Sequence, residues 1–88
     1  MIEQNLKIIN EHGLHARPAA QLVNVAGKFT SDIKILKDGL EVNGKSIMGV
    51  MMLAAEKGSE ITLIIEGDDE QEAFNAINEL INNSFYEK

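Results

Sequence analysis

"EITLIIEGDDEQEAFNAINELI", residues 60–81, holds two patterns from which the fold of this chain can be predicted. Its first part, up to Gly67, is rich in β-branched residues and indicates a strand. In its second part, Asp69 and Glu72 have the spacing of a helix capping box. Apolar residues then fall on one helical face, at Phe74, Ile77, Leu80 and Ile81. A helix that is apolar on one side only has to bury that side against a second layer of structure.

Two strand-like runs lie in the middle of the chain, "DIKILK" at residues 32–37 and "LEVNG" at residues 40–44. They are joined by Asp38 and Gly39, a dipeptide that favours a tight hairpin turn. We therefore expect the two runs to pair as antiparallel strands.

The N-terminal part of the chain predicts a further strand and a helix. In "NLKIIN", residues 5–10, apolar and polar residues alternate, as they do in a strand with one buried face. From Ala16 to about Phe29, apolar residues recur at spacings of three and four, which indicates a helix. Pro18 suits the first turn of that helix, because its missing N–H group is not needed there.

A second, shorter helix is expected over "SIMGVMMLAA", residues 46–55, with Ser46 as its N-cap and Gly58 as its stop signal. The element order is then βαββαβα within a single domain, residues 1–88. We predict an α+β fold, a two-layer open-faced β-sandwich in which one face of an antiparallel sheet carries all the helices. The other face, which includes Lys34, is expected to meet water.

Composition limits the classes of function. The 88 residues, 44% of them hydrophobic, suit one compact domain with one core. There is no cysteine, so disulfides and thiolate metal sites are excluded and a reducing cytoplasm is permitted. The longest apolar run, residues 50–55, is far shorter than the roughly 20 residues of a membrane span, and no secretion signal is recognisable. A net charge of −6 disfavours nucleic acid and membrane surfaces as partners. The acids of residues 68–72 are interpreted as a solvated helix start.

"GLHARPAA", residues 13–20, places a histidine and an arginine at the start of the first predicted helix. A helix N-terminus carries free backbone N–H groups and a partial positive charge, so it stabilises an anion. His15 lies just before that end, and an imidazole can take up a group covalently near neutral pH. Arg17 offers donors that match phosphate oxygens. The combination predicts a phosphorylated histidine whose phosphoryl group is held by backbone N–H groups and by Arg17.

Simpler interpretations of the same residues stay open at this point. His15 alone fits a solvent-exposed helix cap, and Arg17 fits an ordinary surface residue. His12 and His15 also suggest a metal site, although two imidazoles with no third ligand nearby are fewer ligands than zinc or copper usually takes. Paired carboxylates, a Ser/His/Asp set and a glycine-rich phosphate loop are all missing from the sequence, which disfavours an autonomous enzyme.

The shorter helix is expected to keep one apolar face exposed. Ile47, Met48 and Met51 fall on one side of it, whereas Val50 and Leu53 fall on another, so both sides cannot join the core. Methionine adapts to partners of different shape, which suits a docking surface.

Two motifs, "GLHARPAAQLV" at residues 13–23 and "VNGKSIMGVMMLAAEKGSEI" at residues 42–61, resemble the HPr family. These are the histidine-containing phosphocarrier proteins of the bacterial phosphoenolpyruvate-dependent phosphotransferase system. The likeness extends through essentially the whole chain and implies four antiparallel strands under three helices. It also implies that His15 receives a phosphoryl group on Nδ1 from enzyme I and passes it to enzyme IIA proteins. The partners would supply the catalysis, and no cofactor is implied.

The resemblance assigns roles to further residues. Arg17 and Pro18 would belong to the phosphorylation site, together with the backbone N–H groups of Ala16 and Arg17. Ser46 corresponds to the regulatory serine that HPr kinase/phosphorylase modifies; without the resemblance it would be interpreted only as a helix N-cap. A docking surface is implied at Leu14, Ala20, Ile47, Met48 and Met51.

The sequence leaves several questions open. The second motif also resembles nitrogen-type phosphocarriers, and a transcriptional regulator is a further candidate partner. A purely regulatory interaction module acting through phospho-Ser46 is the alternative function, which the presence of His15 disfavours. The family more often carries a small or polar residue at the position of His12, so a second imidazole there is expected to alter the lability of phosphohistidine or to bind metal. The sequence does not set the direction of that effect. A free-standing carrier needs no oligomer, so we expect a monomer.

Overall fold

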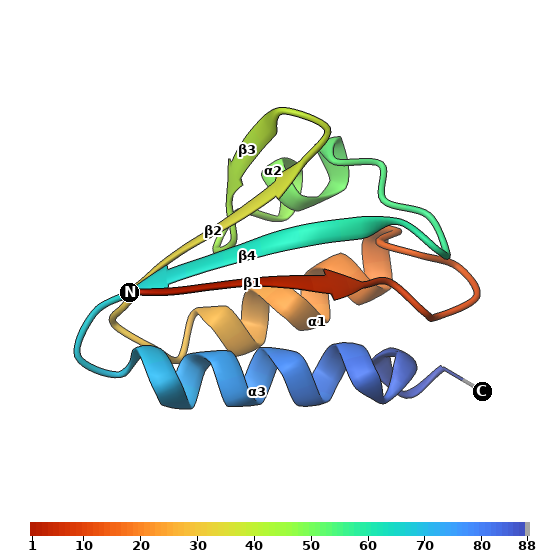
Figure 1. Cartoon of the computed structure of the whole chain (residues 1–88). Helices are drawn as coiled ribbons and strands as arrows, with labels where there is room; N and C mark the ends of the chain where they lie inside the picture. The colour runs from red at the N-terminus through yellow and green to blue at the C-terminus, as the bar shows by residue number, and fades with distance from the viewer. Residues whose placement is uncertain (88) are drawn as a thin grey trace.

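The chain folds as a four-stranded antiparallel sheet with three helices (Figure 1). The computed structural model describes residues 1–87. Its elements are β1 (Ile2–Lys7), α1 (Ala16–Ala26), β2 (Asp32–Lys37), β3 (Leu40–Asn43), α2 (Ile47–Met52), β4 (Glu60–Glu66), α3 (Glu70–Asn82) and the short 3-10 helix η1 (Ser84–Tyr86). The predicted order of strands and helices is confirmed, with η1 added after α3.

The strands lie in the order β1-β4-β2-β3, and each neighbouring pair is antiparallel. β2 and β3 form the predicted hairpin around Asp38 and Gly39, whose positive φ angles of 50° and 84° are those of a tight turn. β4, which forms the first part of residues 60–81, lies inside the sheet between β1 and β2, and this place explains its apolar composition.

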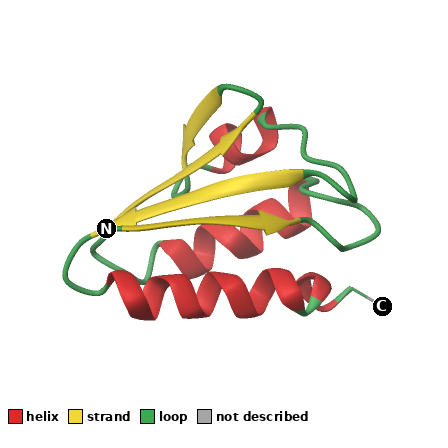
Figure 2. Cartoon of the chain, in the orientation of Figure 1, coloured by secondary structure: helices red, strands yellow, loops and turns green. Residues whose placement is uncertain are grey.

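One face of the sheet forms the floor of the core, and the helices cover that face (Figure 2). Ile61, Leu63 and Ile65 of β4 are at most 1% exposed, whereas the residues between them reach solvent. The helices contribute Leu22 from α1 and Ile77 from α3, both fully buried. This alternation confirms the open-faced, two-layer arrangement that the sequence predicts. Among residues 1–87, no helix has the length and apolar character needed to cross a membrane.

Two helices end earlier than the sequence pattern predicts. α1 ends at Ala26, and the N–H groups of Lys28 and Phe29 bond to carbonyls three residues back in a closing turn. α2 ends at Met52, well before Gly58, because Ala54 has a left-handed φ of 50° that breaks the helix. The apolar residues that follow a helix end can still be buried, which is why periodicity alone overestimated both lengths.

The predicted capping box at the start of α3 is wrong. Asp69 is the N-cap residue, but its side chain makes no cap hydrogen bond. Its carboxylate instead accepts hydrogen bonds from the backbone N–H groups of Thr30 (2.9 Å) and Ser31 (3.0 Å) and from the Ser31 hydroxyl. These bonds, with the Ser31 hydroxyl as the largest contribution, lower the pKa of Asp69 to about 2. Asp69 is therefore not simply part of a solvated helix start: it ties the loop before β2 to the start of α3.

Candidate functional site

His15 occupies the N-cap of α1, the position that the sequence predicts. Its backbone is extended, with φ −74° and ψ −176°, and its carbonyl accepts the first helical hydrogen bond, from the N–H of Ala19 at 2.9 Å. The N–H groups of Ala16 and Arg17 precede that bond, so they have no acceptor within the helix. Pro18 has no N–H group at all. The exposed His15 side chain thus lies beside two free backbone donors at the positive end of an eleven-residue helix.

The loop that carries His15 is anchored to the segment after α2. The Leu14 N–H donates to the Ala55 carbonyl at 2.8 Å, and the Leu14 side chain is only 2% exposed. Gly13 has φ 61°, and a Cβ atom there would overlap the Ala55 carbonyl oxygen. Glycine is therefore required on both conformational and steric grounds. Because α2 ends at Met52, the segment that follows it can place the Ala55 carbonyl against this loop.

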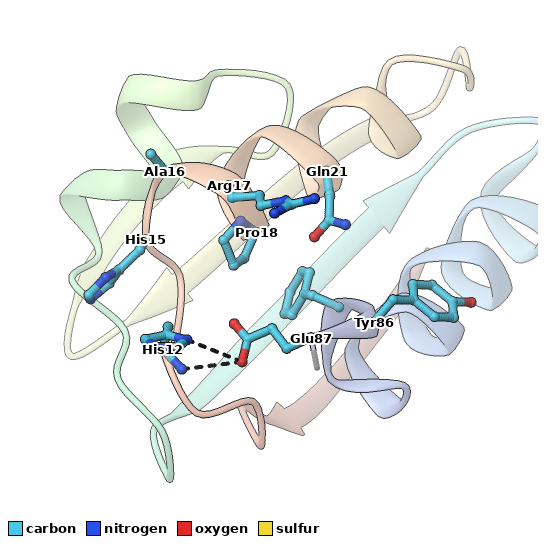
Figure 3. A pocket seen from close by; sticks show the side chains of 9 residues that line it. His12, His15, Ala16, Arg17, Pro18, Gln21, Tyr86 and Glu87 are labelled. Atoms are coloured by element: carbon cyan, nitrogen blue, oxygen red, sulfur yellow. Dashed lines mark hydrogen bonds and ion pairs between the residues drawn. The ribbon is translucent and has the colours of Figure 1, made fainter.

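A cleft opens beside His15, lined by side chains from three separate segments (Figure 3). Arg17 and Gln21 come from α1, His12 from the loop before it, and Glu87 from the end of the chain. The Arg17 side chain extends toward Gln21 rather than toward the His15 ring (Figure 3). Within residues 1–87, Arg17 takes part in no ion pair. Its guanidinium is therefore available for an anion that arrives at the helix end.

His12 and Glu87 lie together at one edge of this cleft, below Arg17 and Gln21 in Figure 3. One Glu87 oxygen lies 3.6 Å from His12 Nδ1 and accepts the His12 backbone N–H at 3.4 Å. The other oxygen accepts a hydrogen bond from Asn10 Nδ2 at 2.8 Å, and Asn10 also bonds to the Gly13 carbonyl at 2.8 Å. The bond from Asn10, followed by the contacts with His12, lowers the pKa of Glu87. Glu87 is thus held to the loop that carries His15.

Glu87 was not predicted from the sequence, because nothing in its local pattern indicates where this last segment lies in the fold. Ser84, Phe85 and Tyr86 all have left-handed φ angles, of 54°, 53° and 57°, although none is glycine. Such a run is unfavourable by itself and needs compensation from packing. Phe85 is 2% exposed and belongs to the core, which fixes the reversal and delivers Glu87 to the cleft.

Ser46 is the N-cap of α2, and its hydroxyl oxygen accepts the Gly49 N–H at 3.1 Å. The exposed apolar face predicted for this helix is present. Ile47, Met48 and Met51 are 43%, 73% and 42% exposed, whereas Val50 and Leu53 are buried. Met52, 65% exposed, also reaches solvent, and it was not among the predicted docking residues.

The other two predicted docking residues have different environments. Ala20 is half-buried on α1 and retains some surface for a partner. Leu14 is 2% exposed and belongs to the core, although it also lines a depression that His15 and Met51 share. Its docking role therefore stays a prediction, and in the structure its burial and its N–H bond to the Ala55 carbonyl hold the His15 loop in place.

His12 and His15 lie near each other, with ring centroids 6.4 Å apart. The metal hypothesis needs a third ligand with suitable geometry. Across residues 1–87, no group of three or more histidine, cysteine or acidic side chains is placed to hold a metal ion. In the part of the chain that the structure describes, the site presents an exposed imidazole, two N–H groups with no acceptor in the helix, a helix end and a guanidinium outside any ion pair, a combination that suits a transient anion.

Comparison with known proteins agrees with this geometry. A family model described as "PTS HPr component phosphorylation site" matches residues 2–83. A phosphocarrier protein HPr from Cupriavidus necator is 52% identical over 99% of this chain and 98% of its own length. An HPr-like protein Crh from Halalkalibacterium halodurans is 56% identical over 88% of this chain and 92% of its own. A crystal structure of HPr from Thermoanaerobacter tengcongensis superposes with a TM-score of 0.96 at 49% identity, covering 100% of this chain and 99% of the other.

Proposed function

The chain belongs to the HPr family of phosphocarriers of the phosphotransferase system, and from that membership we propose that His15 is the residue that carries the phosphoryl group. An HPr protein is a carrier and not a catalyst. The observation that supports His15 most directly is its place at the N-cap of α1, exposed and next to the free N–H groups of Ala16 and Arg17. This is the environment in which a newly formed anion is stabilised without a dedicated pocket.

The proposed reaction is a reversible transfer of a phosphoryl group to and from His15 Nδ1. A lone pair on His15 Nδ1 attacks the phosphorus of phosphorylated enzyme I, the new N–P bond forms, and the bond to enzyme I breaks. In the second transfer a nucleophilic atom of an enzyme IIA protein attacks the phosphorus, a new bond forms to that atom, and the N–P bond to His15 breaks. Arg17 turns from its place beside Gln21 to the phosphoryl oxygens, and the helix end supplies the remaining donors. An exposed site suits this exchange, because the partner must reach the phosphorus from the open side.

The exposed face of α2 supports a docking role close to the phosphorylation site. Met51 lines a second, smaller depression together with His15 and Ala16, so the apolar face of α2 continues to the reactive histidine. We propose that enzyme I and enzyme IIA proteins dock on Ile47, Met48 and Met51, with Ala20 at the edge. We further propose that the protein acts in the cytoplasm as a monomer and without a cofactor.

A regulatory role for Ser46 is the second proposal, and its support is the position of that residue. Ser46 lies at the start of the helix that carries the docking face, and the relatives of this chain include the HPr-like protein Crh. Phosphorylation of Ser46 by HPr kinase/phosphorylase would add nearly two negative charges beside this face. The helix N-terminus tolerates the charge locally, so we expect docking to weaken without a change of fold.

Incubation with enzyme I and labelled phosphoenolpyruvate tests the main proposal. We expect one acid-labile, base-stable phosphoryl group, which His15→Ala removes while the circular dichroism spectrum stays unchanged. Asn24→Ala is the matched control, since Asn24 is an exposed residue of the same helix outside the site, and it should be labelled normally. Undiminished labelling of His15→Ala would contradict the proposal. Labelling by the kinase at Ser46 with none by enzyme I would favour the purely regulatory function instead.

A further inference from the structure

His12 is a second imidazole at the cleft to which the proposed function gives no role. Its side chain is 69% exposed, and its ring lies 6.4 Å from that of His15, centroid to centroid, at an interplanar angle of 51°. Both rings line the same cleft (Figure 3). A phosphoryl group on His15 would extend from its ring by two covalent bonds, so its oxygens would occupy part of the space between His15 and its neighbours.

Glu87 determines which nitrogen of His12 is available. It lies 3.6 Å from His12 Nδ1 and accepts the backbone N–H of the same residue, as the dashed lines in Figure 3 mark. A carboxylate in this place favours a proton on Nδ1, because a negative acceptor fixes the tautomer of the imidazole that it contacts. Nε2 is then the nitrogen left for another partner. The hydrogen bond from Asn10 keeps Glu87 in position.

From this arrangement we propose that His12 is an additional positioning residue, which donates from protonated Nε2 to the phosphoryl group on His15 while Glu87 holds its Nδ1. The inference rests on the proposed function of His15 and deepens it. It also gives a direction to the effect of the second imidazole: His12 stabilises the phosphorylated form.

The protonation state of His12 sets when this contact exists. With both nitrogens protonated, Nε2 donates to a phosphoryl oxygen. In the neutral ring the proton stays on Nδ1 toward Glu87, and the Nε2 lone pair then faces oxygens that are also electron-rich. The contact therefore needs an imidazole that carries both protons, so the stabilisation is stronger at acidic pH than at alkaline pH.

The other charged groups near His12 do not produce this pH dependence of the phosphorylated form. Arg17, in the same cleft, carries a guanidinium that stays charged at acidic and alkaline pH alike. Glu11, the neighbour of His12 in the chain, is paired with Lys57 at 3.1 Å. Glu87 stays ionised at both mildly acidic and alkaline pH, since its pKa is lowered. His15 itself is the phosphorylated group and is common to every protein compared below.

A competition experiment measures the effect directly. Wild type and His12→Asn are mixed in equal amounts with a catalytic quantity of enzyme I and limiting phosphoenolpyruvate, so that enzyme I equilibrates the phosphoryl group between them. Mass spectrometry after an alkaline quench separates the four species by mass. We expect about a threefold preference for wild type at about pH 6 and no preference at about pH 8.5, and a threefold preference is typical of an exposed charge pair.

Two further variants make the outcome decisive. His12→Lys keeps a positive charge at both pH values. At acidic pH it should therefore take up the phosphoryl group as well as wild type does, unlike His12→Asn. Glu11→Gln, a charge change on the same loop outside the cleft, should give no pH-dependent preference. Equal partition between wild type and His12→Asn at both pH values, or the same pH trend for Glu11→Gln, would overturn the inference while leaving the role of His15 intact. A wild type that takes no phosphoryl group at all would instead overturn the proposed function.

Discussion

Replacement of Gly13 by alanine should destabilise the fold through the contact that anchors the His15 loop. The φ angle of 61° costs a residue with a Cβ atom about 1–2 kcal/mol. The added Cβ would also overlap the Ala55 carbonyl oxygen and lie 2.8 Å from the Cα atom of Glu56. Both neighbours are backbone atoms that cannot rotate away, so overpacking adds about 1–3 kcal/mol. We therefore expect Gly13→Ala to lower the free energy of unfolding by about 2–5 kcal/mol in total.

Gly39→Ala provides a matched control for this prediction. Gly39 has a comparable φ of 84°, but no atom lies within 4 Å of the place of its Cβ. It should lose only the conformational contribution, about 1–2 kcal/mol. Urea unfolding followed by circular dichroism gives both values, and the difference between them isolates the contact with the Ala55 carbonyl. Equal losses in the two variants would refute the argument that this contact holds the loop. Phosphorylation by enzyme I should also slow more in Gly13→Ala, since only that variant displaces His15.

Three other predictions concern different parts of the molecule. The folded-state pKa of Asp69 is about 2, below its ordinary value of 3.8, so its contribution to stability is present above about pH 4 and is lost as pH falls toward about 2. The urea midpoint of Asp69→Asn should therefore lack the part of the wild-type pH dependence that falls in this interval. Phe85→Ala should cost about 3 kcal/mol, because the ring is 2% exposed, whereas Ala in place of the 59% exposed Tyr86 should change stability by less than about 0.5 kcal/mol. Met48→Asp should leave the unfolding free energy within about 0.5 kcal/mol of wild type and raise the KM of enzyme I for this protein, measured by steady-state labelling.

The order of the elements could be predicted because each signal for it is local. The β-branched run of β4, the Asp38-Gly39 turn and the apolar stripe of α3 each lie within a short window of sequence. His15 could be found in the same way, since the residues that follow it begin a helix. The exposed face of α2 followed from the spacing of its apolar residues.

The features that the sequence did not reveal depend on residues far apart in the chain. Asp69 has the spacing of a cap, but its hydrogen bonds go to Thr30 and Ser31, 39 and 38 positions away. Glu87 reaches the loop of Asn10, 77 positions away, through a left-handed turn that contains no glycine. Local periodicity carries no information about such partners. The same holds for Leu14, whose burial depends on where the chain runs after α2.

The division between fixed and free groups at the site suits a carrier. The backbone around His15 is held firmly, by the Leu14 N–H bond to Ala55 and by the steric demand at Gly13. The side chains around His15 are fixed by fewer contacts. Arg17 has no ion pair within residues 1–87, and His12 is mostly exposed. Donors fixed in the backbone preserve the geometry of the reacting nitrogen at no further cost in ordering. Side chains that must leave solvent to reach the phosphoryl group each contribute only modestly, which keeps the bound group transferable to the next partner.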